Sequence, residues 1–280
     1  MATDDQLGAD RSLAMMLKSP MLHQPTPATQ LACEQMAGDK PKRLLRNALR
    51  RAGFEIKKHD PEGTYAKRRQ RLLESERVDL VLDVGAHAGE FGQALRHEGY
   101  KGRIVSFEPV RSHHERLQAL AAADGNWTCR RAAVGDRSGE VEIHISGNDG
   151  FSSSVRKMAA VHEAADPSSS YVGSEMVEMT TLDRLVGEVL HPEDRAFLKV
   201  DTQGFESEVL AGAARALDSC HLVELELVLV ELYDRQAQFA ELVDQMLDRG
   251  FVLTDVESGF RDERTSQLLQ IDGIFVRSSA

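Results

Sequence analysis

A short apolar segment that ends in a glycine turn and continues into a helix constrains this chain most strongly. Residues 78–84 read VDLVLDV, and their aliphatic, β-branched side chains are typical of a strand buried in a parallel sheet. The strand is expected to stop at Gly85, and a helix is expected over residues 90–97. A strand, a tight glycine turn and a helix present backbone N–H groups at the carboxyl edge of an α/β sheet, where ligands bind.

The spacing of the glycines indicates which ligand this turn accepts. A dinucleotide fingerprint starting at Gly85 needs two further glycines, but His87 and Glu90 stand at those positions. Asp83 before the turn and Gly89 at the helix start fit S-adenosylmethionine (SAM) instead. A strand-end carboxylate can meet the SAM ammonium, directly or through water, and N–H groups at a helix start can meet its carboxylate. A plain strand–helix turn is the alternative interpretation.

A second acid is predicted to hold the ribose of the cofactor. Residues 103–107 (RIVSF) are expected to form the second strand, and Glu108 follows them directly. An acid at the tip of the second strand, about 20 residues after the glycine turn, is where two adenosine hydroxyls are bound. The alternative is that Glu108 only caps a helix or forms a salt bridge.

The middle of the chain departs from plain alternation of strands and helices. A third strand is expected over residues 127–134, and Asp136 then either lines the adenine side of the site or only forms the turn 135–139. This turn is expected to join the third strand in a hairpin to an alternating strand over residues 140–146. Residues 147–154 (GNDGFSSS) are interpreted either as a lid or substrate loop or as an ordinary polar loop.

The remaining elements resume the alternation. Helices are expected over residues 64–76, 112–123, 178–190, 205–217 and 239–249, and strands over residues 197–200, 222–232, 251–255 and 270–277. Ser112 is predicted to cap the second of these helices, and Thr181 belongs to a capping pattern in the third. Strands that alternate with helices predict an α/β fold with a mainly parallel sheet.

Three acids in the second half of the chain are candidates for catalysis. Asp201 stands at the carboxyl end of the strand 197–200, in the position that faces a transferred group. A hydroxyl acceptor needs a general base within about 3 Å or a metal that lowers its pKa, and Asp201 could serve either way. Glu206 and Glu226 are expected to support it, since an unpaired acid such as Glu226 inside an apolar strand costs several kcal/mol. The alternative is that Asp201 and Glu206 only stabilise a helix N-terminus.

Composition excludes several classes of protein. The net charge of −11 argues against a general nucleic-acid binder. No segment approaches the roughly 18 apolar residues of a membrane span, and the acidic start MATDDQLGAD does not resemble a secretory signal. The three scattered cysteines lack metal-site spacing and fit a reducing compartment, so we expect a cytoplasmic protein.

Three regions are expected along the chain. Residues 1–39 are interpreted as a tail that either wraps a neighbouring copy in a homo-oligomer or is mobile. Residues 40–77 form a basic helical extension with thirteen Lys or Arg and five Asp or Glu residues. This extension is either a solvated face or a docking surface for an anionic substrate or lipid head group. Residues 78–280 are expected to form the catalytic domain.

Several segments together resemble the FkbM family of SAM-dependent methyltransferases. They are LDVGAHAGEFG (82–92), SFEP (106–109), AAVGD (132–136), TTLDRL (180–185), LKVDTQGFESEVLAGA (198–213), LELVLVELYDRQAQF (225–239) and LLQIDGIFVR (268–277). The resemblance extends from about residue 43 to residue 277 and departs at His87, where family members usually have Asn. It implies a Rossmann-like class I methyltransferase fold with a mainly parallel seven-stranded sheet and an antiparallel C-terminal strand. It also implies O-methylation of a hydroxyl on a sugar, a polyketide or another secondary metabolite.

The resulting site prediction assigns residues to the two reactants. The residues expected to contact SAM are Asp83, Gly85, Ala86, His87, Gly89, Phe91, Glu108, Pro109, Ala133 and Val134. Asp201, Glu206 and Glu226 are expected at the small-molecule or carbohydrate acceptor, with Asp201 as the base. Two acids are an incomplete set for a hard cation, so no metal site is predicted. The competing hypotheses are a nicotinamide-dependent reductase, a non-catalytic SAM-binding regulator and an RNA methyltransferase.

Overall fold

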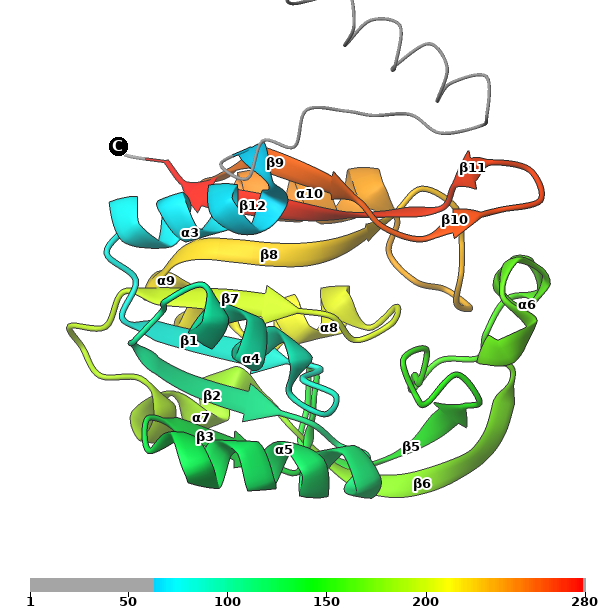
Figure 1. Ribbon diagram of the computed structural model, residues 1–280, viewed down its shortest axis with the longest axis horizontal. Helices are drawn as coiled ribbons and strands as arrows, with labels where there is room; N and C mark the ends of the chain where they lie inside the picture. Colours follow the sequence, from blue (N-terminus) through cyan, green and yellow to red (C-terminus); the bar gives the residue numbers. More distant parts are fainter. Residues whose placement is uncertain (1–62, 279–280) are drawn as a thin grey trace, which may run out of the picture. The chain divides into compact units, whose positions relative to one another are not determined.

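The computed structural model describes residues 63–278, which form an α/β fold around one large sheet (Figure 1). The helices are α3 (Tyr65–Ser75), α4 (Glu90–His97), α5 (Arg111–Asp124), α6 (Ala160–Ala165), α7 (Leu182–Val189), α8 (Glu206–Ala211), α9 (Ala214–Asp218) and α10 (Phe239–Asp248). The strands are β1 (Leu80–Val84), β2 (Arg103–Phe107), β3 (Trp127–Arg130), β4 (Ala133–Val134), β5 (Gly139–Ser146), β6 (Tyr171–Thr180), β7 (Ala196–Val200), β8 (Cys220–Val228), β9 (Phe251–Ser258), β10 (Arg261–Asp262), β11 (Gln267–Leu268) and β12 (Gln270–Arg277).

The large sheet has seven strands in the order β3-β2-β1-β7-β8-β12-β9. The first five are parallel, whereas β12 runs antiparallel to both β8 and β9. The sequence-based prediction of a mainly parallel seven-stranded sheet with an antiparallel C-terminal strand is therefore confirmed. The bounds predicted for α4, β2 and β12 agree with the structure, and β1 occupies the end of the predicted first strand.

Two apolar layers enclose this sheet (Figure 1). Leucines of α3, α4 and α5 pack on one face with residues of β1 and β2, namely Leu73, Leu95, Leu117, Val81 and Ile104. Residues of the helices α7 to α10 pack on the other face, namely Leu182, Val209, Ala216 and Leu242. Because both faces are covered, every residue of β1 is buried, as its uninterrupted apolar sequence predicts.

The hairpin predicted between residues 127–134 and residues 140–146 is wrong. β3 ends at Arg130 because its partner β2 ends at Phe107, opposite Arg130. β4 then leaves the large sheet and pairs in parallel with β6, and β5 pairs antiparallel with β6, which gives a small sheet in the order β4-β6-β5. β5 and β6 extend beyond the carboxyl ends of the main strands (Figure 1).

Three predicted helices differ from the observed ones. Residues 178–180 belong to β6, and the helix begins only after Thr181, whose hydroxyl accepts a hydrogen bond from the Arg184 N–H at 3.1 Å as predicted. The helix predicted over residues 205–217 is split into α8 and α9 at Gly212, where a Cβ atom would lie 1.9 Å from the Gly135 carbonyl oxygen. Ser112 lies inside α5, and Val110 precedes the helix instead.

The predicted N-terminal regions are described only in part. Residues 1–39 and the first part of the extension 40–77 lie outside the described residues. The helix expected over residues 64–76 is α3, and Thr64 caps it by accepting a hydrogen bond from the Lys67 N–H at 3.3 Å. Across residues 63–278, no helix combines the length and the apolar character needed to span a membrane.

Candidate active site at the carboxyl edge of the sheet

A cavity of about 450 Å³ opens at the carboxyl ends of the central strands, within the size range of small-molecule sites. Eight of the residues predicted to contact the cofactor line it: Gly85, Ala86, His87, Phe91, Glu108, Pro109, Ala133 and Val134. Asp201 also lines it, whereas Asp83, Gly89, Glu206 and Glu226 do not. Exposed Asp136 does not line the cavity and pairs with Arg137 at 2.9 Å, as expected for a turn residue.

The glycine turn after β1 lies against the loop that carries Asp201. Gly85 has a φ of +79°, and a Cβ atom there would lie 1.8 Å from the Asp201 carbonyl oxygen. The N–H groups of Gly85 and Ala86 both donate to the Phe107 carbonyl oxygen at 3.0 Å. Only glycine allows this close approach in a left-handed conformation, so Gly85 sets the distance between the turn and the Asp201 loop.

Gly89 serves packing at the start of α4. It has a φ of +97°, and a Cβ atom there would lie 3.1 to 3.2 Å from the side chains of Leu117, Leu120 and Trp127. Gly89 therefore allows α4 to lie close to α5 and β3. Gly89 is not among the residues that line the cavity, so the cavity does not support its predicted contact with the cofactor.

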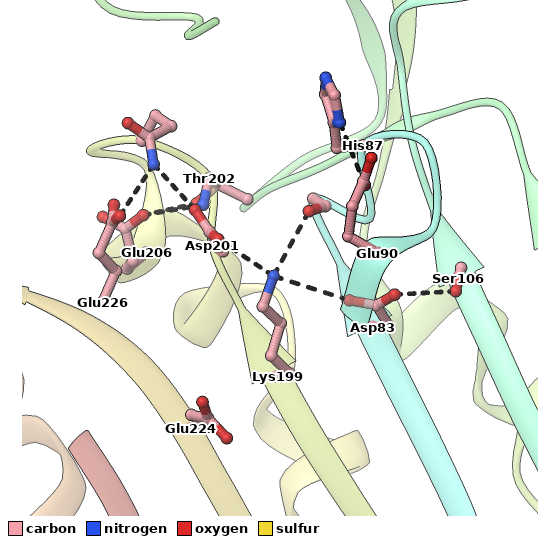
Figure 2. Close-up of polar contacts among 12 residues, drawn as sticks. Asp83, His87, Glu90, Ser106, Lys199, Asp201, Thr202, Glu206, Glu224 and Glu226 are labelled. Carbon is pink, nitrogen blue, oxygen red and sulfur yellow. Dashed lines mark hydrogen bonds and ion pairs between the residues drawn. The ribbon is translucent and has the colours of Figure 1, made fainter. Parts of the chain in front are cut away.

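Asp83 is completely buried below the cavity wall. Its Oδ2 accepts a hydrogen bond from the Ser106 hydroxyl at 3.0 Å, and its Oδ1 lies 3.8 Å from Lys199 Nζ (Figure 2). Burial raises the pKa of this carboxyl, although the Lys199 charge and the Ser106 hydrogen bond oppose the shift. Lys199 lines the cavity, so the lysine and not Asp83 is the group available to a ligand at this point.

Glu108 lines the cavity while holding two backbone segments together. Its side chain accepts hydrogen bonds at 2.8 Å from the His87 N–H of the glycine turn and from the Val110 N–H before α5. Glu108 is only 5% exposed, and this burial raises its pKa to about 7 despite the two hydrogen bonds. The predicted ribose ligand thus also supports the start of a helix, so the two interpretations of Glu108 are compatible.

His87 connects the glycine turn to the loop 147–154. Its Nδ1 lies 3.1 Å from Glu90 Oε2, and its Nε2 lies 2.8 Å from the Asp149 carbonyl oxygen. Its ring stacks on Phe151 at a centroid distance of 4.2 Å and contacts His113 at 4.0 Å. Phe151 lines the cavity, so the loop 147–154 adjoins the site. This position is compatible with the interpretation of the loop as a lid or substrate loop.

Lys199 is a cation with a side chain only 12% exposed, and the sequence patterns did not identify it. Its Nζ lies 3.1 Å from Asp201 Oδ2 and 3.5 Å from the Gly85 carbonyl oxygen (Figure 2). The negative charges of Asp201 and Asp83 raise the pKa of Lys199 and outweigh the opposing effect of burial. A lysine within the otherwise apolar strand AFLKV was the signal that could have identified it.

Gln203 brings two of the predicted acids together and was also missed. Its Nε2 donates to Asp201 Oδ1 at 2.9 Å and to Glu226 Oε1 at 2.8 Å, while its Oε1 accepts from the Tyr233 hydroxyl at 2.7 Å. The Asp201 side chain is 40% exposed, whereas Glu226 is buried. Burial and the nearby charges of Asp201 and Glu206 raise the pKa of Glu226 well above its ordinary value.

Glu206 stabilises the loop that carries Asp201. Its Oε1 accepts hydrogen bonds from the N–H and the hydroxyl of Thr202, both at 3.0 Å (Figure 2). It also accepts a hydrogen bond from the Gly204 N–H at 3.1 Å. Burial raises the pKa of Glu206. These contacts favour a supporting role, in agreement with the helix-stabilising alternative.

Carboxylates outnumber cations in the cavity. Its lining includes the acids Glu90, Glu108, Asp201, Glu224 and Asp272, the bases Arg69 and Lys199, and the histidines His87 and His113. An excess of acids fits SAM, whose sulfonium and ammonium groups are both cationic. No group of three or more His, Cys, Asp or Glu residues within residues 63–278 could hold a metal ion.

Comparisons with known proteins identify the chain's relatives. The family model described as the methyltransferase FkbM domain matches residues 83–253. The 2-O-methyltransferase NoeI of Sinorhizobium fredii (strain NBRC 101917 / NGR234) is 25% identical over 206 residues, which cover 71% of this chain and 84% of the relative.

Solved structures give weaker matches. A methyltransferase FkbM from Methylobacillus flagellatus KT has a TM-score of 0.44 and 14% identity, and the match covers 70% of this chain and only 43% of that one. Magnesium protoporphyrin IX methyltransferase (ChlM) from Synechocystis PCC 6803 with bound SAM has a TM-score of 0.40 and 12% identity, over 85% and 97% of the two chains.

Proposed function

The chain belongs to the FkbM methyltransferase family, and from this premise we propose that it transfers a methyl group to a hydroxyl oxygen of a small molecule or glycan. It is a SAM-dependent methyltransferase. Family membership therefore argues against two competing hypotheses from the sequence, the nicotinamide-dependent reductase and the non-catalytic regulator. The proposed acceptor is a sugar, a polyketide or another secondary metabolite. A relative named as a 2-O-methyltransferase supports oxygen as the methylated atom.

The adenosine part of the cofactor is assigned to the side of the cavity near β2. Glu108 is the proposed ligand of the ribose, with Pro109, Ala133 and Val134 at the adenine. The glycine turn around Gly85 provides the backbone that a ligand can approach closely. The bound cofactor supplies an electrophilic methyl group on a sulfonium.

This proposal depends on the position of Asp201 in the cavity wall. Asp201 is the one predicted catalytic acid that both lines the cavity and is partly exposed, with a side-chain exposure of 40%. We assign it as the base that removes the acceptor proton. Lys199 and Gln203 hold its two oxygens at 3.1 and 2.9 Å, so the carboxylate is oriented before the acceptor arrives.

Glu206 and Glu226 are assigned supporting roles. Glu206 fixes the backbone at Thr202 and Gly204, and Glu226 holds the Gln203 amide that contacts Asp201. We further propose a cytoplasmic location, which the unpaired thiols of Cys129 and Cys220 support because such thiols are usual in a reducing compartment.

An assay with isotope-labelled SAM tests this function. The full chain is incubated with SAM and separate pools of sugars and glycosides, phenolic and polyketide alcohols, amines, and RNA, and the labelled product is identified by mass spectrometry and NMR. We expect an O-methyl product from one of the two hydroxyl pools. An N-methyl product, or label in RNA, would contradict the proposal.

A matched pair of variants tests the assigned base. Asp201→Asn should lower kcat by about 100-fold or more, since positioned general bases contribute at least that much. Asp248→Asn changes an exposed acid at the end of α10 and should leave kcat unchanged. Full turnover in Asp201→Asn would remove the assignment of the base but not that of the reaction.

A further inference from the structure

We propose that Tyr233 is a positioning residue for methyl transfer. Its hydroxyl fixes the Gln203 amide, which orients the base Asp201, and it ties this amide to the loop 147–154. Tyr233 is not among the described residues that line the cavity, so it acts through Gln203 and not on a ligand. This inference rests on the proposed function and deepens it, because it adds a residue on which the assigned base depends.

The Gln203 amide has one orientation that suits all three of its neighbours. Its Nε2 donates to Asp201 and Glu226 at 2.9 and 2.8 Å, and its Oε1 accepts from the Tyr233 hydroxyl at 2.7 Å. An amide turned by 180° would place its carbonyl oxygen against the two acids. The Tyr233 hydroxyl and the acids therefore select the same orientation, the one in which the amide can hold Asp201.

The backbone of Gln203 adopts a conformation that is unfavourable for glutamine. Its φ is +55°, in the left-handed region that Gly adopts readily and most other residues avoid. Such a conformation persists where surrounding contacts determine it, and it is frequent at active sites. A glycine would form this turn more easily, so the presence of a long amide side chain indicates a role beyond the turn itself.

Tyr233 is held in place before any ligand binds. It is only 1% exposed and shares a buried apolar cluster with Val228 and Leu269. A Cβ atom at Gly204 would lie 2.9 Å from the Tyr233 Cβ, so Tyr233 lies directly against the Asp201 loop. Burial and the charge of Glu226 raise the pKa of the Tyr233 phenol well above its ordinary value, so the hydroxyl keeps the proton that it donates.

The same hydroxyl reaches the loop 147–154. It lies 3.1 Å from the Ser152 carbonyl oxygen, so its single hydrogen is shared between this oxygen and Gln203 Oε1. In the same loop, the Ser154 hydroxyl donates to the Gln203 carbonyl oxygen at 2.6 Å. The loop is therefore joined to both the side chain and the main chain of Gln203. Ordering of this loop around a ligand would also steady the base.

A pair of tyrosine-to-phenylalanine variants tests this role. Tyr233→Phe removes one hydroxyl and keeps the buried ring, so it should fold normally. With the hydroxyl acceptor identified by the labelled-SAM assay, it should lower kcat about 2- to 10-fold, the effect of one hydrogen bond, and leave the KM for SAM unchanged. The control Tyr100→Phe removes a hydroxyl that donates to the Arg103 carbonyl oxygen at 3.4 Å, near the amino end of β2, and should change neither constant.

A double-mutant cycle tests whether Tyr233 acts through Gln203. Gln203→Met keeps the length of the side chain but removes the amide, so it should lower kcat about 10- to 100-fold, as for a hydrogen bond to a charged group. Adding Tyr233→Phe to this variant should lower kcat no further, because the link to Asp201 is already lost. Effects that multiply would mean that Tyr233 supports the fold independently of Gln203, and would overturn the proposal.

Amide hydrogen exchange tests the link to the loop without an acceptor. In the ligand-free full chain, Tyr233→Phe should speed exchange about 2- to 10-fold in residues 147–154 and 201–204. Exchange in α7 should stay unchanged. Unaltered exchange in the two segments, or an equal increase throughout the chain, would overturn the link.

The outcomes separate this role from the proposed function. If Asp201→Asn is impaired while Tyr233→Phe turns over as fast as the unmodified chain, the positioning role is overturned and the proposed function stands. An N-methyl product would contradict the proposed function, and full turnover in Asp201→Asn would contradict the assigned base. The positioning role would fall with either of them.

Discussion

Replacing Glu108 with glutamine should change how the stability of the ligand-free protein depends on pH. Glu108 has an ordinary pKa of 4.5, and burial raises it to about 7 in the folded chain. The unfolded chain therefore releases this proton at lower pH than the folded chain does. Between about pH 4.5 and 7 the folded state binds more protons, so the Glu108 contribution to stability falls as pH rises through this window.

The magnitude follows from the two pKa values. A pKa difference of this size corresponds to about 3 kcal/mol at full effect, and about 2 kcal/mol of it is lost between pH 5 and pH 7. Conversion to an energy is appropriate because Glu108 is only 5% exposed, and little solvent screening applies.

Urea unfolding at a series of pH values between 5 and 8 measures this effect. The quantity of interest is the free energy of unfolding of the unmodified chain minus that of Glu108→Gln, since titrating groups that do not interact with Glu108 cancel in this difference. The glutamine variant also loses a backbone contact, but that loss is independent of pH. The difference should fall by about 2 kcal/mol from pH 5 to pH 7. A difference that stays constant with pH, or that rises, would refute the reasoning.

Three further changes have expected outcomes. Gly85→Ala should lower the free energy of unfolding, measured by chemical denaturation, by several kcal/mol more than the control Gly99→Ala. Both glycines have a positive φ, but only a Cβ atom at Gly85 would collide with the backbone. Lys199→Met should cost roughly 3 to 5 kcal/mol by the same measurement, because it leaves buried Asp83 without its cation. His87→Asn should speed amide hydrogen exchange in residues 149–154 by removing a ring contact worth about 1 kcal/mol, and unchanged exchange would show that the loop is held by other contacts.

Local patterns were enough to predict the centre of the sheet. β1, α4 and β2 follow from apolar runs, a glycine turn and an acid at a strand tip, all within about 30 residues of one another. The same reasoning correctly predicted that Asp201 lies at the carboxyl end of β7 and lines the cavity.

Elements that depend on distant partners could not be predicted in this way. β6 pairs with β4 and β5, and its exposed, polar residues give no strong strand signal. Gly212 ends a helix because the backbone of Gly135 lies against it, a contact between segments far apart in the sequence.

The missed site residues share a similar reason. Lys199 and Glu224 interrupt apolar strands, and their charges become meaningful only when the strand register places them opposite each other. Tyr65 and Arg69 reach the cavity because α3 covers the same face of the sheet, which no spacing within α3 indicates.

The close contact of Gly85 with the Asp201 backbone has an evolutionary consequence. The Asp201 N–H also donates to the Val84 carbonyl oxygen at 3.0 Å, so direct contacts between main-chain atoms help to fix where the glycine turn and the Asp201 loop meet. Mutations that reshape the outer loops to admit a new acceptor therefore leave this alignment intact. Such a scaffold can diversify its outer loops without rebuilding the junction between the glycine turn and the Asp201 loop.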